Sequence, residues 1–196
     1  MTSPRPGGRT ARTRAAVAEA VQAELLEFGY AGTTMERIAQ RAGVAKTTLY
    51  RRWGSVGQLV VDLFGETAAA QIPPPDTGTL EGDLRELGRA SIALLSVPPL
   101  RAVFDVVVGE AVHDAAARAV LTGFFATRIA LAAPLVERAV ARGEAPAGTD
   151  AAEVIRLVGA PYFARAYITG DPLDPAVADR TARILALAVR EGLLAG

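Results

Sequence analysis

The stretch KTTLYRR, residues 46–52, gathers side chains that bind phosphate groups and the edges of nucleotide bases. It offers positive charge, hydroxyl groups and one aromatic ring, from Lys46, Thr47, Thr48, Tyr50, Arg51 and Arg52. Groups of this kind hydrogen-bond to phosphate oxygens and base edges, and an α-helix that carries them fits the major groove of B-DNA. The simpler alternative is the solvated basic face of an ordinary helix.

A helix over residues 45–53 must position these side chains. Nine residues are too few for a helix to persist alone in water, so neighbouring helices must hold it. Leu49 and Trp53 are four residues apart and therefore share one face, which can point inward. The basic and hydroxyl-bearing side chains then lie on the opposite face, where a partner can reach them.

The turn before this helix is predicted at Gly43, because glycine adopts the positive φ that a tight turn between helices requires. The preceding helix follows Thr33 or Thr34 and runs to Ala42. Thr33-x-x-Glu36 has the form of a capping box for its start. Two short helices around a glycine-containing turn are typical of a helix-turn-helix unit.

Helical patterns also account for the rest of the chain. The first helix starts near Thr10 and ends at Phe28, because Gly29 suits the position after a helix end. Ser55-x-x-Gln58 is a second capping box, which opens a fourth helix. Further helical patterns, separated by segments rich in proline and glycine, cover residues 80–97, 100–113, 115–143, 150–169 and 174–194. The sequence therefore predicts an all-α fold of about nine helices.

The composition narrows the class of protein. The chain has 196 residues, and 51% of them are hydrophobic, which is enough for a packed core. The absence of cysteine excludes disulfides, thiolate zinc sites and a cysteine nucleophile. The N-terminus lacks the apolar segment of a secretory signal, and no run of 18 apolar residues could cross a membrane. We therefore expect a soluble, cytoplasmic protein with no membrane partner.

The formal net charge is zero, but the charges are unevenly distributed. Residues 1–53 contain nine basic and four acidic side chains, a net charge of +5, so the rest of the chain carries −5. A basic N-terminal part on an acidic body indicates that a polyanion binds to the N-terminal part only.

The residues around the predicted helix-turn-helix resemble a known family. The stretch AVAEAVQAELLEFGYAGTTMERIAQRAGVAKTTLYRRWGSVGQLVVDLF resembles the N-terminal domain of the tetracycline-repressor (TetR) family of transcriptional regulators. The resemblance covers about residues 10–65. It implies a three-helix DNA-binding domain over residues 10–54, and a helical domain over residues 55–196 that dimerises and binds a small effector. Residues 1–9 would then be a flexible, arginine-containing arm.

By this resemblance, seven residues are predicted to contact double-stranded DNA: Thr34, Lys46, Thr47, Thr48, Tyr50, Arg51 and Arg52. Thr34 would touch a backbone phosphate at the start of the second helix. Lys46 and Tyr50 would contact phosphates, and Thr47 or Thr48 would lie near bases.

One position departs from the family pattern. Val56 follows Ser55, where the family usually has a lysine, so one phosphate contact is missing at that corner. The arginine-rich arm could compensate by entering the minor groove, as such arms do. The alternative is a flexible tail without a role.

The stretch VERAVARGEAPAGTDAAEVIRLVGAPYFARAYITGDPLD resembles the C-terminal region of some TetR-like regulators. In this family the last two long helices pair with their copies in a dimer. The residues predicted for that contact are Ile155, Val158, Tyr167, Ile184 and Leu187. The alternative for each of them is a place in the core of one protomer.

The resemblance also implies an effector pocket between the middle helices. The residues predicted to line it are Phe104, His113, Phe124, Arg128 and Tyr162. The alternatives are ordinary core positions for the aromatic residues and a surface position for the histidine. The few charged groups in this region favour an apolar or amphipathic effector. No metal ion or cofactor is predicted.

Two other classes of protein fit the sequence less well. An enzyme has little support, because the chain has one histidine and none of the G-x-S-x-G, H-E-x-x-H, P-loop or dinucleotide-binding motifs. An interaction module that kept the fold but lost DNA binding is disfavoured by the basic face of residues 46–52. The sequence therefore predicts a ligand-responsive repressor that binds a palindromic operator as a homodimer, and activation in place of repression remains open.

Overall fold

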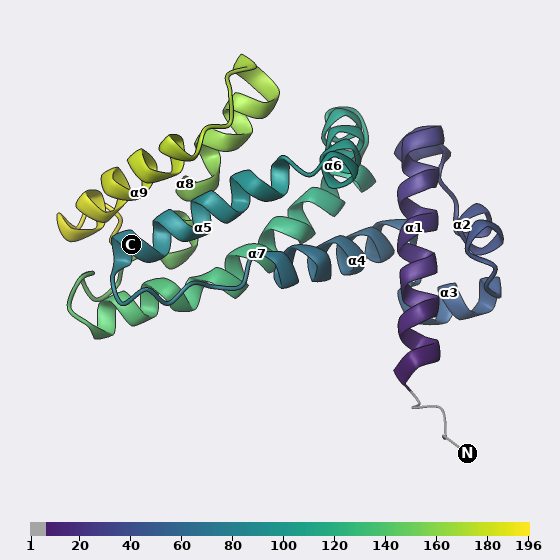
Figure 1. Cartoon of the computed structure of the whole chain (residues 1–196), viewed down its shortest axis with the longest axis horizontal. Coiled ribbons are helices and arrows are strands. Elements are labelled where there is room, and N and C mark those ends of the chain that lie inside the picture. Colours follow the sequence, from purple (N-terminus) through teal and green to yellow (C-terminus); the bar gives the residue numbers. More distant parts are fainter. Residues whose placement is uncertain (1–6) are drawn as a thin grey trace. The chain divides into compact units, whose positions relative to one another are not determined.

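The computed structural model describes the backbone of residues 7–196 and the side chains of residues 11–65, 72–97 and 100–196. Within these residues the chain forms nine α-helices, one short π-helical segment and no strand (Figure 1). The α-helices are α1 (Gly7–Gly32), α2 (Met35–Ala42), α3 (Lys46–Trp53), α4 (Val56–Gln71), α5 (Leu80–Leu95), α6 (Pro98–Ala111), α7 (Ala115–Ala141), α8 (Ala151–Ala164) and α9 (Pro175–Arg190). The predicted all-α class with about nine helices is confirmed.

The N-terminal helices begin and end close to the predicted residues. α1 starts at Gly7, three residues before the expected start, and its helical geometry is interrupted at Gly29, where φ is 68°. The proposed arm falls largely outside the described residues, because the backbone is described only from residue 7 onward and the side chains only from residue 11 onward. The arm therefore stays a prediction.

The capping residue of α2 differs from the prediction. Thr34, not Thr33, is the N-cap, and its Oγ1 accepts a hydrogen bond from the backbone N–H of Arg37 at 3.2 Å. Thr33 is buried, and its hydroxyl donates to the carbonyl oxygen of Gly29 at 2.6 Å. The buried hydroxyl of Thr33 thus pairs with a carbonyl oxygen near the end of α1. The exposed hydroxyl of Thr34 pairs with a free N–H at the start of α2.

The chain packs as two compact units. The first comprises Met1–Glu66 and Pro99–Phe124, and the second comprises Thr67–Pro98 and Phe125–Gly196. The first unit therefore holds α1, α2 and α3 together with most of α4, α6 and the beginning of α7. Residues 99–124, which the sequence assigns to the C-terminal domain, pack with the helix-turn-helix.

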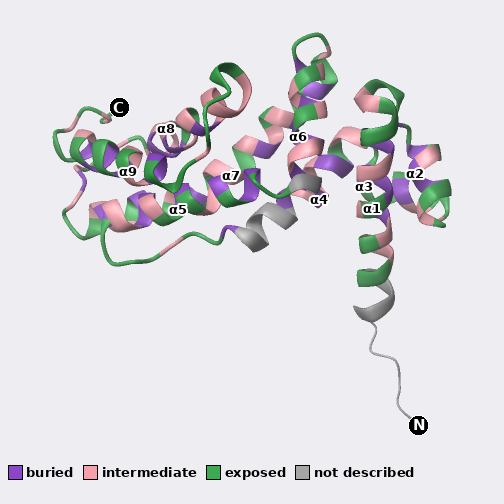
Figure 2. Cartoon of the chain, turned by 45° about the horizontal axis from the view of Figure 1, so that its top comes forward, coloured by how far each residue is buried: buried purple, intermediate pink, exposed green. Residues whose placement is uncertain are grey.

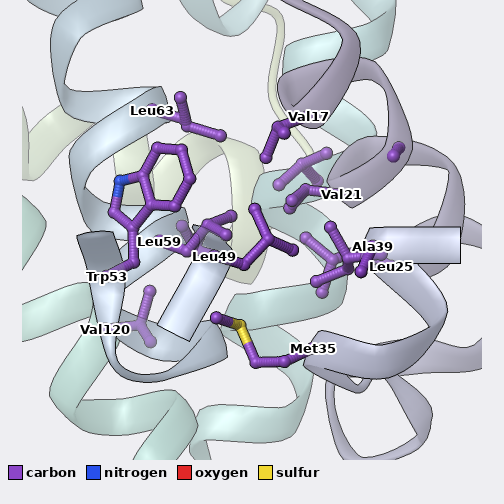
Figure 3. Close-up of a cluster of buried hydrophobic side chains, with 14 of the residues drawn as sticks. Val17, Val21, Leu25, Met35, Ala39, Leu49, Trp53, Leu59, Leu63 and Val120 are labelled. Atoms are coloured by element: carbon purple, nitrogen blue, oxygen red, sulfur yellow. The ribbon is translucent and has the colours of Figure 1, made fainter. Parts of the chain in front are cut away.

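The core of the first unit is a cluster of apolar side chains from α1, α2, α3, α4, α6 and α7 (Figure 3). The labelled members are Val17, Val21, Leu25, Met35, Ala39, Leu49, Trp53, Leu59, Leu63 and Val120. Leu49 is fully buried, and burial of a leucine side chain contributes about 1.5–3 kcal/mol. The predicted inward face of the short helix is therefore the face that holds α3 in place.

In the second unit α5 and α9 lie side by side, and α8 packs against both (Figure 1). Gly88 of α5 permits this close approach, because a Cβ there would clash with the hydroxyl of Tyr162 and lie 3.0 Å from Cβ of Ala178. Tyr162 is fully buried, and burial raises the pKa of its hydroxyl to about 12. The hydroxyl therefore remains protonated at neutral pH.

By length and composition α7 is apolar enough to cross a membrane. The sequence has no run of 18 consecutive apolar residues in this helix, because charged residues such as Arg128 interrupt it. Inside the protein, 28% of the most apolar 18-residue window is buried. Core helices of soluble proteins also pass this test, so a single helix of this kind is weak evidence for a membrane span.

Candidate nucleic-acid interface

The exposed positions of α3 carry most of the side chains that the sequence singles out. Figure 2 shows how exposed and buried residues alternate along the helices of the chain. Six of the seven residues predicted to contact DNA are exposed and one is half-buried: Thr34, Lys46, Thr47, Tyr50, Arg51 and Arg52 are exposed, and Thr48 is half-buried. Leu49 and Trp53 point into the core from the same helix. The two faces of α3 thus have the division expected of a helix that docks in a groove.

The turn between α2 and α3 is built on Gly43. This residue has φ 65° and ψ 32°, the left-handed conformation that glycine adopts without steric cost. Its N–H donates to the carbonyl oxygen of Gln40 at 3.2 Å, and the N–H of Val44 donates to that of Ala39 at 3.0 Å. These bonds close the end of α2 and fix the direction in which α3 leaves.

A buried carboxylate fixes α2 against α1. Glu24 is 3% exposed and accepts hydrogen bonds from Nε of Arg37 and Nε of Arg41, each at 2.6 Å. Burial alone would raise the pKa of Glu24, but the two guanidinium groups outweigh burial and lower it. The guanidinium carbon of Arg37 also lies 3.4 Å from the ring centroid of Phe28. Arg37 is therefore committed to contacts within the protein.

A second carboxylate joins the end of α3 to α4. Asp62 accepts a hydrogen bond from the indole N–H of Trp53 at 2.6 Å and from Arg14 at 2.9 Å. Although partial burial raises the pKa of Asp62, these hydrogen bonds lower it overall. The guanidinium of Arg52 lies 4.8 Å from the Trp53 ring centroid. α3 is thus anchored to α4 through the hydrogen bond from Trp53 to Asp62.

A third carboxylate holds the corner between α1 and α2. Glu110 of α6 accepts hydrogen bonds from the backbone N–H groups of Tyr30 at 2.6 Å and Ala31 at 2.9 Å. These N–H groups directly follow the kink at Gly29, where they have no helical carbonyl partner four residues back. Burial, followed by the charges of Asp114 and Glu110, raises the pKa of Tyr30. The corner is therefore attached to α6, 80 residues further along the chain.

Glu36, which the sequence assigns only to a capping box, lies at the outward face of the helix-turn-helix beside Lys46. Its carboxylate forms an ion pair with Nζ of Lys46, and the hydroxyl of Tyr50 donates to the same carboxylate at 3.4 Å. The hydrogen bond from Lys46 is the main cause of the lowered pKa of Glu36, and the same bond raises the pKa of Lys46. The spacing of Glu36 and Lys46 becomes informative only when the crossing of α2 and α3 is known.

The predicted pocket residues are divided between the two units. Phe104 and Phe124 contact each other edge to face, with ring centroids 5.0 Å apart. They help to line an apolar cavity of about 20 Å³ between α4, α6 and α7. A cavity of this volume holds about one water molecule, so it has no room for a larger molecule.

The other three predicted pocket residues do not line this apolar cavity. His113 is exposed in the turn after α6. Arg128 and Tyr162 belong to the second unit, where Arg128 donates to the carbonyl oxygen of Ile72 at 3.2 Å and Tyr162 is part of the core.

The residues predicted for a dimer contact differ in how far their side chains are exposed. Ile155 and Val158 are buried inside the second unit, which leaves little of either side chain for a partner. Tyr167 is half-buried and stacks on Phe163, with centroids 6.3 Å apart. Ile184 and Leu187 of α9 are exposed, at 59% and 55%. Of the five predicted residues, only Ile184 and Leu187 are exposed, and the dimer contact stays a prediction.

Two family models match the chain. One, described as bacterial regulatory proteins of the tetR family, matches residues 17–63. The other, described as the tetracyclin repressor-like C-terminal domain, matches residues 74–185. The first covers the helix-turn-helix, and the second covers most of the body of the chain.

Individual proteins agree with these models over nearly the whole chain. The HTH-type transcriptional regulator YdeS of Bacillus subtilis (strain 168) is 30% identical over 174 residues, which is 89% of this chain and 88% of the relative. The DNA-binding transcriptional repressor TetR of Mycobacteroides abscessus is 31% identical over 191 residues, 92% and 95% of the two chains. The crystal structure of the TetR family transcription regulator SCO0332 superposes with a TM-score of 0.70 and 30% identity, over 90% of this chain and 98% of the other.

Proposed function

The chain belongs to the TetR family of DNA-binding transcriptional regulators, and from this premise we propose that it is a repressor that binds a palindromic operator as a homodimer. The observation that carries the proposal is the outward face of α3, whose Lys46 and Tyr50 side chains are exposed while Leu49 is buried. A regulator that binds chromosomal DNA works in the cytoplasm of a bacterium. The proposed role is binding rather than catalysis.

The proposed dimer uses the outer face of α9. Ile184 and Leu187 are one helical turn apart and exposed, whereas Leu185 and Val189 point into the unit. Exposed apolar side chains that share a helix face favour contact with another protein surface. A twofold-symmetric dimer would place two copies of α3 in major grooves about 34 Å apart, one turn of the duplex.

The proposed effector is apolar or amphipathic, and it releases the operator. The apolar cavity that Phe104 and Phe124 help to line is the candidate starting point, but α4, α6 and α7 would have to separate to admit a ligand. A ligand shifts the equilibrium only if it binds the DNA-free state more tightly than the DNA-bound state. Glu110 and Asp62 join α6 and α4 to the helix-turn-helix, so such a separation would reach α3.

Selection of bound duplexes from a random DNA pool tests the proposal. We expect a palindromic consensus whose half-sites are about one helical turn apart. A variant with both Lys46→Ala and Tyr50→Ala should select no consensus while sedimenting like the parent. Enrichment of a consensus by this variant would show that α3 does not read the DNA, and an asymmetric consensus would contradict the dimer.

A further inference from the structure

Glu36 and Lys46 form an ion pair at the surface that the proposed function assigns to DNA. The side chains are 50% and 54% exposed, so both reach the solvent in which a duplex would approach. The hydroxyl of Tyr50 donates to the same carboxylate, and Nζ of Lys46 lies 5.5 Å from the centroid of the Tyr50 ring. Two of the predicted phosphate contacts therefore already share an anionic partner within the protein.

A DNA phosphate and the Glu36 carboxylate compete for the same groups. Each is an oxygen anion that accepts hydrogen bonds from an ammonium and a phenol. If Lys46 stays with Glu36, one phosphate contact is not made. If Lys46 moves to a phosphate, Glu36 is left as an unpaired negative charge near the backbone of the duplex. Both outcomes weaken binding through phosphates.

This cost falls on every DNA sequence, because random DNA and a matching site are both bound through phosphates. Binding to random sequence depends almost entirely on these contacts, whereas binding to a matching site also gains contacts to base edges. A carboxylate at this position therefore lowers both affinities by a similar factor, and random DNA, which has no base contacts to add, is the partner that is released first.

We propose that Glu36 is an affinity-limiting residue of this surface, which competes with DNA phosphates for Lys46 and Tyr50 and so limits the time that the protein spends on random DNA. This inference rests on the proposed function, because it requires that α3 binds DNA. It adds a residue of α2 to the determinants of DNA affinity and gives that residue an unfavourable role in binding.

Salt titrations of DNA binding test the inference with a charge-matched control. Glu36→Gln and Glu19→Gln each remove one negative charge, and Glu19 is exposed on α1. On a random-sequence duplex, Glu36→Gln should tighten Kd by about threefold or more and steepen the slope of log Kd against log salt by about 0.9 per protomer. Glu19→Gln should change both quantities much less. On the selected operator the gain from Glu36→Gln should be of similar size, because the same contacts to phosphates are released there.

A double-mutant cycle separates competition from simple charge repulsion. In a Lys46→Gln background, Glu36→Gln should tighten binding to random DNA much less, because only Tyr50 then remains to be released. An unchanged gain in that background would overturn the inference, as would equal effects of the Glu36 and Glu19 variants. If the parent binds neither duplex, the proposed function fails and the inference fails with it. Parent binding without a difference between the two glutamine variants overturns the inference alone.

Discussion

At the scale of single residues, the helix-turn-helix depends on carboxylates placed against arginine, lysine and backbone N–H groups. Glu24 is the most buried of the four acids in residues 1–53, and it joins Arg37 and Arg41 to α1. Burying a charge is costly unless it is paired and hydrogen-bonded, and this carboxylate is both. Arg37 and Arg41 therefore stabilise the domain through this carboxylate.

The pKa of Glu24 is lowered in the folded protein, which makes its contribution to stability dependent on pH. The ionised form stabilises the fold at pH values above the ordinary glutamate pKa of about 4.3. This contribution is lost as the pH falls through the lower folded-state pKa. Replacing Glu24 with glutamine should therefore lower the free energy of unfolding at pH 7 by about 2 kcal/mol.

Urea unfolding at pH 7 and at about pH 3 measures this effect. The difference between Glu24→Gln and the parent should be large at pH 7 and should shrink towards the acid limit. The exposed Glu19→Gln variant serves as the control, with little change at either pH. A difference that is independent of pH would mean that the variant loses packing rather than an ionic contact.

At the scale of elements, the kink at Gly29 and the carboxylate of Glu110 form one joint. The combination of φ 68° and ψ 179° at Gly29 lies in a region that is open to almost no residue but glycine. A Cβ at this position would also clash with Oε1 of Glu110. The kink, the hydrogen bonds to Tyr30 and Ala31, and the position of α6 therefore require one another.

Gly29→Ala should destabilise the protein more than Gly43→Ala. Gly43 has φ 65° but no atom within 4 Å of an added Cβ, so alanine there adds only backbone strain of about 1–2 kcal/mol. Alanine at Gly29 adds a less accessible backbone conformation and the clash with Glu110. Denaturant unfolding of the two variants gives the comparison, and equal losses would contradict the account of the joint.

Glu110→Gln should loosen the same joint without disrupting the core. A glutamine carbonyl can accept from only one of the two N–H groups, and its own amide N–H₂ then faces the other donor. We expect faster hydrogen exchange at the amides of Tyr30 and Ala31, and weaker operator binding. Glu137→Gln, at an exposed position of α7, is the control. Unchanged exchange at both amides would show that the carboxylate does not hold the corner.

Local sequence signals predicted most element bounds but few of the contacts between elements. Gly43 marks a helix end in both the sequence and the structure, and Gly29 marks a predicted helix end at which the structure has a kink, because positive φ is a local property. The pairing of Glu110 with Tyr30 spans 80 residues, and nothing in the local pattern reveals it. Apolar periodicity likewise did not separate buried Val158 from exposed Leu187, since it shows that a face is apolar and not what covers it.

At the scale of the whole molecule, the charge distribution favours a polyanion as one partner, and the outer face of α9 favours a protein surface as another. Residues 1–53 carry a net charge of +5, which suits a polyanion, and the remainder carries −5. The exposed apolar pair of Ile184 and Leu187 lies in this acidic remainder. A duplex and a second protomer would therefore bind through separate parts of the chain.

Replacing Ile184 and Leu187 with glutamate should convert the proposed dimer into monomers. Like charges would then meet across the twofold axis, and the apolar contact would be lost. Because each monomer reads one half-site, operator affinity should fall by about 100-fold or more. Sedimentation velocity and operator titration measure the two effects.

Val112→Glu provides the matched control, since Val112 is 65% exposed but belongs to the first unit. It should leave both the oligomeric state and the operator affinity close to those of the parent. If the double glutamate variant remains dimeric, the dimer does not use this face of α9.

Trp53 is the only tryptophan in the chain, and its indole N–H donates to Asp62 where α3 meets α4. The protein therefore carries one indole fluorophore, and it is located where α3 is held against α4. Indole emission responds to its hydrogen-bonding partners and to nearby charges such as the guanidinium of Arg52. Emission from the unlabelled protein should thus report directly on tilting of α3, in stopped-flow mixing with DNA or in a screen of compound libraries.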